Sequence, residues 1–244
     1  MIHPTAIISP KAKLGKNLSV GAFTIIYDNV EIGDDVVIGS HCELGVENHL
    51  CDESPLILGH RSQIRSHSIF YSSSIFGDEL LTGHRVTVRE KVRAGKNLQI
   101  GTLSDLQGHC LIGDYVRFHS NVHIGQKSNI GNYVWIFPYV VLTNDPHPPS
   151  NLHVGVEVKD FAVIATMSVI LPGAIIEEGV LIAAHSCLKG VAEKDSVYAG
   201  TPAKKICETS RIKLTDNSGK SAYPWRKHFH RDYPSDVIKG WIED

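Results

Sequence analysis

The stretch LQGHCLIGDYVRFHSNVHIGQKSNIGNYVWI, residues 106–136, decides the fold. A large apolar residue returns at every sixth position of this stretch: Leu106, Ile112, Phe118, Ile124, Ile130 and Ile136. The period is too long for the heptad of a coiled coil and too regular for a β-sandwich. A hexapeptide period is typical of a parallel β-helix, in which each coil packs on the next one.

The same six-residue step extends from Ile2 to Leu44, from Leu58 to Leu142 and from Val158 to Leu188. Only Thr82 and Ala94 in these series are not large and apolar. A second column lies four residues further on, and its members are mostly small or β-branched: Ala6, Ala12, Thr24, Val36, Cys42, Ser62, Ser68, Ser74, Val86, Cys110, Val122, Ser128, Ser168 and Ala174. One large and one small inward side chain per hexapeptide fit a narrow prism. With three hexapeptides per coil, stacked ~4.8 Å apart, we expect roughly ten coils.

The period is interrupted by two insertions, near residues 45–57 and 143–157. The intervening hexapeptides make up about five whole coils, which corresponds to about 24 Å along the axis. Both insertions therefore leave the same corner of the prism. Long loops on one edge of a rigid repeat scaffold usually border the binding site, and we expect these two to do so.

Composition excludes several classes of function. The formal net charge is -2 and no basic stripe is present, which argues against nucleic-acid binding. No apolar run approaches the ~20 residues of a membrane-spanning helix, and a repeat that begins at Ile2 leaves no room for a secretory leader. The five cysteines are odd in number and lack metal-ligand spacing, so we expect reduced thiols in a cytoplasmic protein.

The chain divides into two predicted parts. Residues 1–204 form the β-helix domain, and residues 205–244 form a C-terminal tail without the repeat. The tail contains the run YPWR at residues 223–226 and a short predicted helix that starts near Ser235. Its aromatic content predicts that it packs on the β-helix or on a neighbouring subunit, where it would cap the unpaired edge of the last coil.

The corners of the prism differ in sequence. On one corner the residue after the apolar position is always glycine, at Gly59, Gly77, Gly95, Gly113 and Gly131, which predicts an unusual backbone conformation there. The other two corners lose glycine in many coils, where its place is taken by Arg65, Tyr71, Arg89, Gln107, His119, Phe137 and Thr143. The reacting centre is therefore expected between residues 65 and 145.

Three histidines in that window are candidate catalytic groups, and each could instead be a solvated corner residue. His84 lies one face before Glu90, and a carboxylate near an imidazole fixes its tautomer and raises its basicity, as a general base requires. His109 lies one coil above Lys91 in the same column, and His119 takes a turn position.

Two further patterns bear on partners. Zinc-binding hexapeptide carbonic anhydrases use one histidine, a second 36 residues later and a third five beyond that. No trio here fits this spacing, because His119 is followed by His123 after four residues, so we expect no metal. The aromatic residues Tyr133, Trp135, Phe137 and Tyr139 point partly off the prism, which predicts a subunit interface more than a stacking platform.

The C-terminal repeats resemble the closing signature of hexapeptide acyltransferases. The matching runs are SVILPGA at residues 168–174, IAAHS at 182–186 and AGTPAK at 199–204. The middle segments TGH at 82–84, VRE at 88–90, FHS at 118–120 and LTNDP at 142–146 resemble acyltransferases that act on nucleotide-linked amino sugars of surface-polysaccharide pathways.

This resemblance implies a left-handed β-helix that assembles as a homotrimer, with acetyl-CoA as cosubstrate in the groove between neighbouring rods. Ala165, Ser168 and Ala183 would supply contacts to the pantetheine, and Lys204 would lie nearer its nucleotide end. The implied reaction is attack of a sugar amine on the thioester, with a histidine base and a backbone N–H that stabilises the oxyanion.

Two alternatives stay open from the sequence. The acceptor group could be a hydroxyl, as in serine acetyltransferases and antibiotic acetyltransferases. The chain could also be a β-helical assembly subunit without chemistry. The intact closing signature and the loss of glycine at two corners favour an enzyme.

Overall fold

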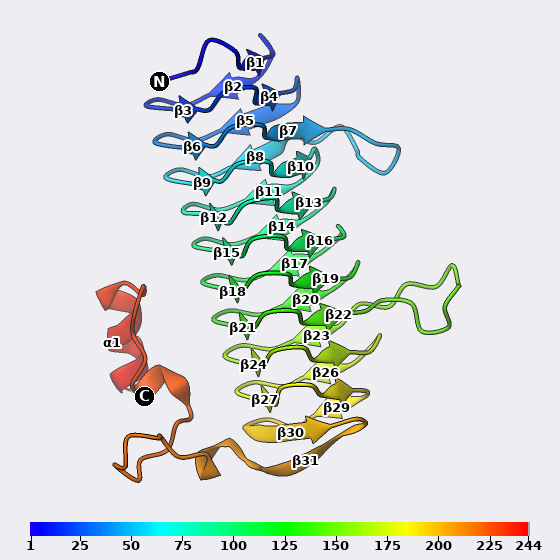
Figure 1. The fold of residues 1–244 in the computed structure, drawn as a ribbon, viewed down its shortest axis with the longest axis vertical. Helices are drawn as coiled ribbons and strands as arrows, with labels where there is room; N and C mark the ends of the chain where they lie inside the picture. The colour runs from blue at the N-terminus through cyan, green and yellow to red at the C-terminus, as the bar shows by residue number, and fades with distance from the viewer. Residues whose placement is uncertain (244) are drawn as a thin grey trace.

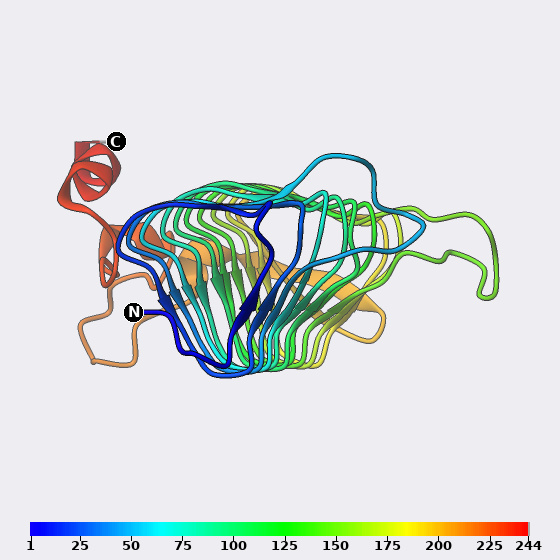
Figure 2. The same cartoon turned by 90° about the horizontal axis from the view of Figure 1, so that it is seen from above.

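The computed structural model describes residues 1–243, which form a rod of triangular coils with a tail along one side (Figure 1). Three parallel sheets make the faces of the rod, with ten, ten and eleven strands. The prediction of a left-handed parallel β-helix of about ten coils is confirmed. Seen from above, the coils superimpose as a triangle from which two loops project (Figure 2).

The first face contains β1 (Ile7–Ile8), β4 (Ile25–Ile26), β7 (Glu43–Val46), β10 (Ile69–Tyr71), β13 (Thr87–Val88), β16 (Asp105–Leu106), β19 (His123–Ile124), β22 (Val141–Leu142), β25 (Val169–Ile170) and β28 (Cys187–Leu188). The second face contains β2 (Lys13–Leu14), β5 (Val30–Ile32), β8 (Leu56–Leu58), β11 (Ile75–Phe76), β14 (Arg93–Ala94), β17 (Leu111–Ile112), β20 (Asn129–Ile130), β23 (Glu157–Val158), β26 (Ile175–Ile176) and β29 (Val191–Ala192).

The third face contains β3 (Ser19–Val20), β6 (Val37–Ile38), β9 (Gln63–Ile64), β12 (Leu81–Thr82), β15 (Gln99–Ile100), β18 (Arg117–Phe118), β21 (Trp135–Ile136), β24 (Val163–Ile164), β27 (Leu181–Ile182), β30 (Ser196–Gly200) and β31 (Ala203–Glu208). The strand β31 runs antiparallel to β30 and covers the edge of the last coil. The three-residue 3₁₀ helices η1 (Thr209–Arg211) and η2 (Trp225–Lys227) and the helix α1 (Ser235–Glu243) follow it. The helix α1 has nine residues, too few to cross a bilayer, and no longer helix occurs among residues 1–243.

The two inward columns of the sequence fill the core. The large apolar side chains from Val20 onward are buried with few exceptions, and the small column lies between them. Its hydroxyls are satisfied by the backbone: Ser68 Oγ donates to the carbonyl of Arg65 at 2.8 Å and accepts the N–H of Val86, one coil further on. Small polar residues of this column therefore fit the core because their hydroxyls bond to backbone groups of the same or the neighbouring coil.

The three corners of the prism differ in the residues and loops that they carry. The loop corner, between the first and second faces, carries both insertions, which follow β7 and β22. The glycine corner joins the second face to the third, and the ridge corner joins the third face to the first. Both insertions leave one corner, five coils apart, as the spacing predicted.

The reason given above for the corner glycines is wrong. Gly59 does not adopt a positive φ; a Cβ there would lie 2.4 Å from the carbonyl carbon of Gly77 on the next coil. The positive φ falls two residues later, on non-glycine residues such as Arg61 and Glu79. Close stacking of backbones, not left-handed conformation, therefore excludes a side chain at this position.

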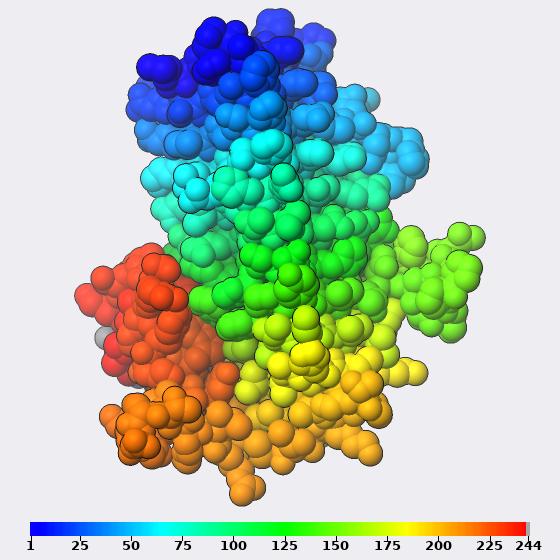
Figure 3. All heavy atoms as spheres, in the orientation of Figure 1, coloured from blue at the N-terminus to red at the C-terminus, as the bar shows by residue number. Residues whose placement is uncertain are grey.

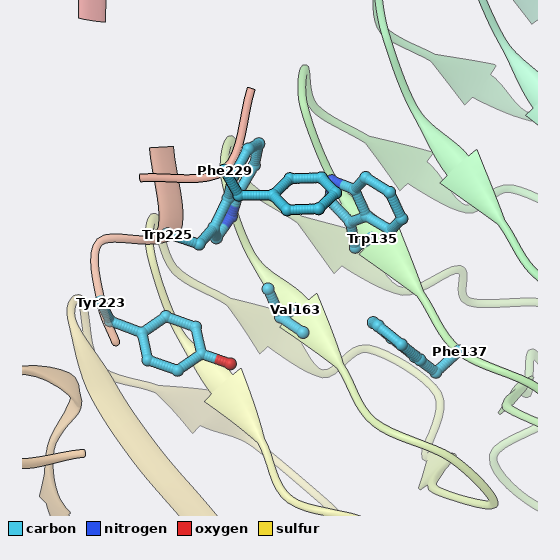
Figure 4. A pocket seen from close by; sticks show the side chains of 6 residues that line it. All are labelled: Trp135, Phe137, Val163, Tyr223, Trp225 and Phe229. Carbon is cyan, nitrogen blue, oxygen red and sulfur yellow. The ribbon is translucent and has the colours of Figure 1, made fainter. Parts of the chain in front are cut away.

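The tail folds back along the third face. Trp225, Phe229, Tyr233 and Trp241 pack on Tyr133, Trp135 and neighbouring aromatic residues of that face. Figure 4 shows the side chains of Trp225 and Phe229 beside Trp135, whose ring centroid lies 5.6 Å from that of Phe229. In the space-filling view the tail lies directly against the rod (Figure 3). The aromatic residues interpreted as a subunit interface are thus largely covered by the chain's own tail.

Candidate active site

Polar side chains gather at the loop corner and the adjacent edge of the first face, in the coils between the two projecting loops that Figure 1 shows. They form the loop-corner strip, which consists of Arg89, Glu90, Lys91, Asp105, Gln107, His109 and His123. The strip contains two pairs of a histidine and a carboxylate.

The first pair is His123 and Asp105, which occupy the same outward position on the neighbouring strands β19 and β16. Nδ1 of His123 lies 3.2 Å from Oδ2 of Asp105. Burial alone would raise the pKa of Asp105, but hydrogen bonds from His123 and Gln107 outweigh burial, and the pKa lies below its usual value. Among residues 1–243, Nε2 of His123 makes no hydrogen bond, so this atom is available to a substrate.

A cavity of about 530 Å³ adjoins His123 under the loop between β22 and β23. Its lining includes Thr143, Asn144 and His147 from this loop and Lys189 from the turn after β28. The loop is braced by Asp145, whose carboxylate accepts hydrogen bonds from the backbone N–H groups of His147 and Ser150 and from the Ser150 hydroxyl. A hydrogen-bonded imidazole thus borders a cavity large enough for part of a sugar or thioester substrate.

The second pair is His109 and Glu90, one coil below the first. The Glu90 carboxylate is fully buried; it accepts a 2.9 Å hydrogen bond from Asn48 in the loop between β7 and β8, and Nε of Arg89 lies 3.3 Å away. Nε2 of His109 lies 4.0 Å from this carboxylate. Glu90 therefore links Asn48 of the first loop to the coil of β13, next to the coil that carries His109.

The expected pairing of His84 with Glu90 is wrong. His84 lies at the ridge corner, where its Nδ1 is 2.8 Å from the Ser66 hydroxyl, whereas Glu90 lies at the loop corner. Six residues carry the chain to the next corner of the prism, so residues that close in sequence lie on different edges. The carboxylate that was assigned to His84 is next to His109.

His119 also lies at the ridge corner and stacks on Phe137, with ring centroids 4.5 Å apart. Burial lowers the pKa of His119, and no carboxylate within 4.0 Å among residues 1–243 offsets that effect. An imidazole that packs on an aromatic ring at the ridge corner is poorly placed to share a proton with the loop-corner strip.

The residues expected to contact the cofactor are spread over the C-terminal coils. Ala165 and Ala183 lie at the ridge corner, but their N–H groups already donate to the carbonyls of Ile182 and Tyr198. Ser168 is fully buried, and its hydroxyl donates to the carbonyl of Ala183, so direct contact with a cofactor is excluded by the core. Lys204 is exposed on β31.

Within residues 1–243 no three histidine, cysteine or acidic side chains come together in an arrangement that would hold a metal ion. The thiols of Cys42 and Cys110 are buried in the core, and burial raises the pKa of Cys110 to about 12, so neither sulfur is available for chemistry.

Asp105 and His123 were missed from the sequence, although a signal was present. They are separated by 18 residues, the length of one coil, and both stand just before the large apolar residue of their hexapeptide. In a three-faced β-helix that spacing places two outward side chains next to each other on adjacent strands. A search for acid–histidine pairs one coil apart would have found them.

Comparison with known proteins agrees with this architecture. The family model for the bacterial transferase hexapeptide, a motif of six repeats, matches residues 11–45. The same six-residue period continues through the three sheets as far as Leu188. The chain is built from hexapeptide repeats.

Curated proteins that resemble this chain are named as sugar-nucleotide acyltransferases. The acyl-[acyl-carrier-protein]–UDP-N-acetylglucosamine O-acyltransferase of Saccharophagus degradans is 33% identical over 130 residues, which cover 46% of this chain and 50% of that protein. The protein of the same name from Rickettsia bellii is 36% identical over 105 residues, or 38% and 35% of the two chains. The chain thus spans at most about half the length of these relatives.

A solved structure extends the likeness in fold. The UDP-N-acetylglucosamine acyltransferase of Arabidopsis superimposes with a TM-score of 0.65 over 85% of this chain and 74% of that chain, at 17% sequence identity. At this identity the superposition shows a common β-helical fold.

Proposed function

We propose that the loop-corner strip transfers an acyl group from a phosphopantetheine thioester to a nucleotide-linked amino sugar. The observation that carries the proposal is the His123–Asp105 pair, which borders a cavity of about 530 Å³ beneath a projecting loop. A hydrogen-bonded imidazole and carboxylate are the expected general base and its orienting group. The names of the curated relatives support the acyl donor and the sugar nucleotide as the substrate classes.

In the proposed reaction the nucleophilic atom of the acceptor attacks the thioester carbonyl carbon. Nε2 of His123 takes the proton from this atom, and Asp105 accepts a hydrogen bond from Nδ1 and stabilises the imidazolium. This attack forms the new bond to the carbonyl carbon, and collapse of the tetrahedral intermediate restores the carbonyl and breaks the carbon–sulfur bond. The departing thiolate takes the proton back from His123, so the enzyme ends in its starting state.

The preferred form of this proposal is N-acetylation, with acetyl-CoA as donor and a sugar amine as acceptor, in a cytoplasmic step of surface-polysaccharide synthesis. The closing-signature runs of residues 168–204 support acetyl-CoA. Because the N–H groups of Ala165 and Ala183 are occupied and Ser168 is buried, contacts to the pantetheine would use side chains and carbonyls of the ridge corner, with Lys204 toward the nucleotide end.

A second form is O-acylation, in which an acyl carrier protein delivers the acyl group to a sugar hydroxyl. The names of the relatives favour this form, since they specify acyl-[acyl-carrier-protein] and O-acyl transfer. His123 could act as the base in N-acylation and in O-acylation, because an amine and a hydroxyl acceptor each lose one proton.

We propose that the chain assembles as a homotrimer through the ridge corner, and not through the aromatic residues of the third face that the tail covers. Four of the exposed large apolar residues, Phe23, Leu103, Tyr139 and Met167, share one column along the ridge corner. The other members of this column include His41, His67, Arg85 and Asn121, so the corner presents exposed apolar side chains between polar ones. Exposed apolar residues on a thin rod are typical of an interface, here with further copies of the chain. Within one chain the ridge corner and the loop-corner strip lie on different edges of the rod. In an assembly, the ridge corner of one copy would pack near the loop-corner strip of another copy.

The direct experiment follows thiol release and product mass with two donors, acetyl-CoA and an acyl carrier protein thioester, and two acceptors, UDP-N-acetylglucosamine and a UDP-sugar with a free amine. We expect acylated sugar nucleotide from one donor–acceptor pair and loss of it in His123→Ala. The pair that reacts decides between N- and O-acylation. Absence of product with every pair would favour the non-catalytic assembly subunit.

A further inference from the structure

A second cavity lies on the third face, where the tail approaches the coils of β12, β15 and β18. It has a volume of about 370 Å³ and is bordered by guanidinium groups from both parts of the chain: Arg65 and Arg117 from the β-helix and Arg231 from the tail. The carboxylate on its lining is that of Asp232. The cavity therefore carries an excess of positive charge.

Two of these guanidinium groups are open to a ligand. Arg65 is exposed, and among residues 1–243 only its backbone atoms take part in hydrogen bonds. Arg231 is also exposed, and its Nε lies 3.9 Å from Asp232, too far for a good hydrogen bond. The two side chains come from segments far apart in sequence and border one cavity.

The third guanidinium, that of Arg117, is buried, with 3% of the residue exposed. It donates to the backbone carbonyl and to Oδ1 of Asn97 and lies 5.2 Å from the ring centre of Tyr233. Within residues 1–243 it has no carboxylate within 4.0 Å. Buried charges in proteins are usually paired with an opposite charge, so an anion in the cavity would complete this arrangement.

Aromatic rings line the same cavity. Trp135 and His119 lie with ring centroids 5.9 Å apart and both border it. Nucleobases stack readily on such side chains, and arginine forks bind phosphate oxygens in a bidentate manner.

We propose that this cavity binds a nucleoside diphosphate, with its phosphates at Arg65 and Arg231 and its base against Trp135 and His119. The cavity lies on the third face, away from the loop-corner strip, and its binding does not require acyl transfer. The diphosphate could belong to a sugar nucleotide or to the adenosine diphosphate portion of coenzyme A. Because Arg231 is on the tail, the ligand would also hold the tail against the β-helix.

Intrinsic fluorescence tests the proposal on the full chain. The chain has three tryptophans; Trp135 lines the cavity, and Trp225 and Trp241 belong to the adjoining tail cluster, so the signal reports this region and not the loop-corner strip. UDP, ADP, inorganic pyrophosphate and uridine are titrated separately. We expect saturable quenching by UDP or ADP and weaker binding of pyrophosphate and uridine. Tighter binding of UDP would indicate a sugar nucleotide, and tighter binding of ADP would indicate coenzyme A.

The matched variants are Arg65→Ala/Arg231→Ala and the control Lys227→Ala, which removes a charge from the exposed part of the tail outside the cavity. The double variant should weaken nucleotide binding by at least ~10-fold, and the control should leave it unchanged. Circular dichroism confirms that each variant is folded. No quenching by any nucleotide at about 1 mM, equal affinity for pyrophosphate, or unaltered binding by the double variant would overturn the proposal.

Discussion

The imidazole of His123 lies 3.2 Å from the carboxylate of Asp105, although 18 residues separate them in the chain. The contact exists because one coil of the β-helix places equivalent positions of β16 and β19 side by side. Gln107 donates a further hydrogen bond to the same oxygen, Oδ2 of Asp105, which helps to fix the carboxylate. The proposed base is thus oriented by residues of the same rigid sheet.

The first prediction concerns the stability contributed by Asp105. Since its folded pKa lies below the usual value of 3.8, the ionised pair stabilises the protein above that pH, and the contribution is lost as pH falls through the folded pKa. Asp105→Asn should therefore be less stable than the wild type near neutral pH, by less than about 1 kcal/mol because the pair is partly exposed. Urea unfolding should show this gap closing toward pH 3; a gap that widens on acidification would contradict the assignment.

The second prediction concerns the anchor of the first loop. Asn48→Ala removes the amide that donates to the fully buried carboxylate of Glu90, and loss of such a partner costs about 1–3 kcal/mol. Asn29→Ala is the matched control, because the Asn29 amide donates to carbonyls of the same loop and touches no charge. Urea unfolding should show a larger loss for Asn48→Ala. Equal losses would mean that Glu90 does not depend on Asn48.

The third prediction concerns the loop between β22 and β23. Residues 145–153 can be replaced by a short Gly-Ser linker that keeps the closing hydrogen bond from the N–H of Val154 to the carbonyl of Asn144. The coil stack should remain, since the loop contributes no strand, but turnover should be abolished because the cavity beside His123 loses its outer wall. Circular dichroism and the acylation assay check the two parts. A folded deletion with unchanged activity would remove this loop from the site.

The fourth prediction concerns assembly. Light scattering should give a trimer, and Leu103→Glu on the ridge corner should reduce the mass to that of the 26.8 kDa monomer. Leu111→Glu is the control, because Leu111 is exposed to the same extent, 53% against 51% for Leu103, but belongs to the second face. A wild-type protein that already scatters as a monomer, or equal dissociation by the two variants, would argue against this interface.

Much of the fold was predictable because its physical cause repeats. The six-residue alternation of large and small inward side chains determines the core, and the number of hexapeptides between Leu44 and Leu142 places both insertions at one corner. The helix near Ser235 was also predicted correctly. These features depend on local sequence and on the stacking of identical units.

The errors have two physical causes. Glu90 was assigned to His84 because six residues separate them, yet contacts between outward side chains on a β-helix occur at one full coil, as Asp105 and His123 show. The packing of the tail on Trp135 could not be predicted. The tail, which supplies Trp225, lacks the repeat, so its path depends on tertiary packing.

The most direct measurement compares kcat for acyl transfer in His123→Ala and His84→Ala. Removal of a general base typically costs 10²–10⁴-fold in rate, so His123→Ala should lower kcat by at least ~100-fold with little change in the KM for the acyl donor. His84→Ala alters a histidine at the ridge corner and should leave kcat within about threefold of the wild type. The reverse pattern, with His123→Ala active and His84→Ala inactive, would contradict the loop-corner strip as the site of chemistry.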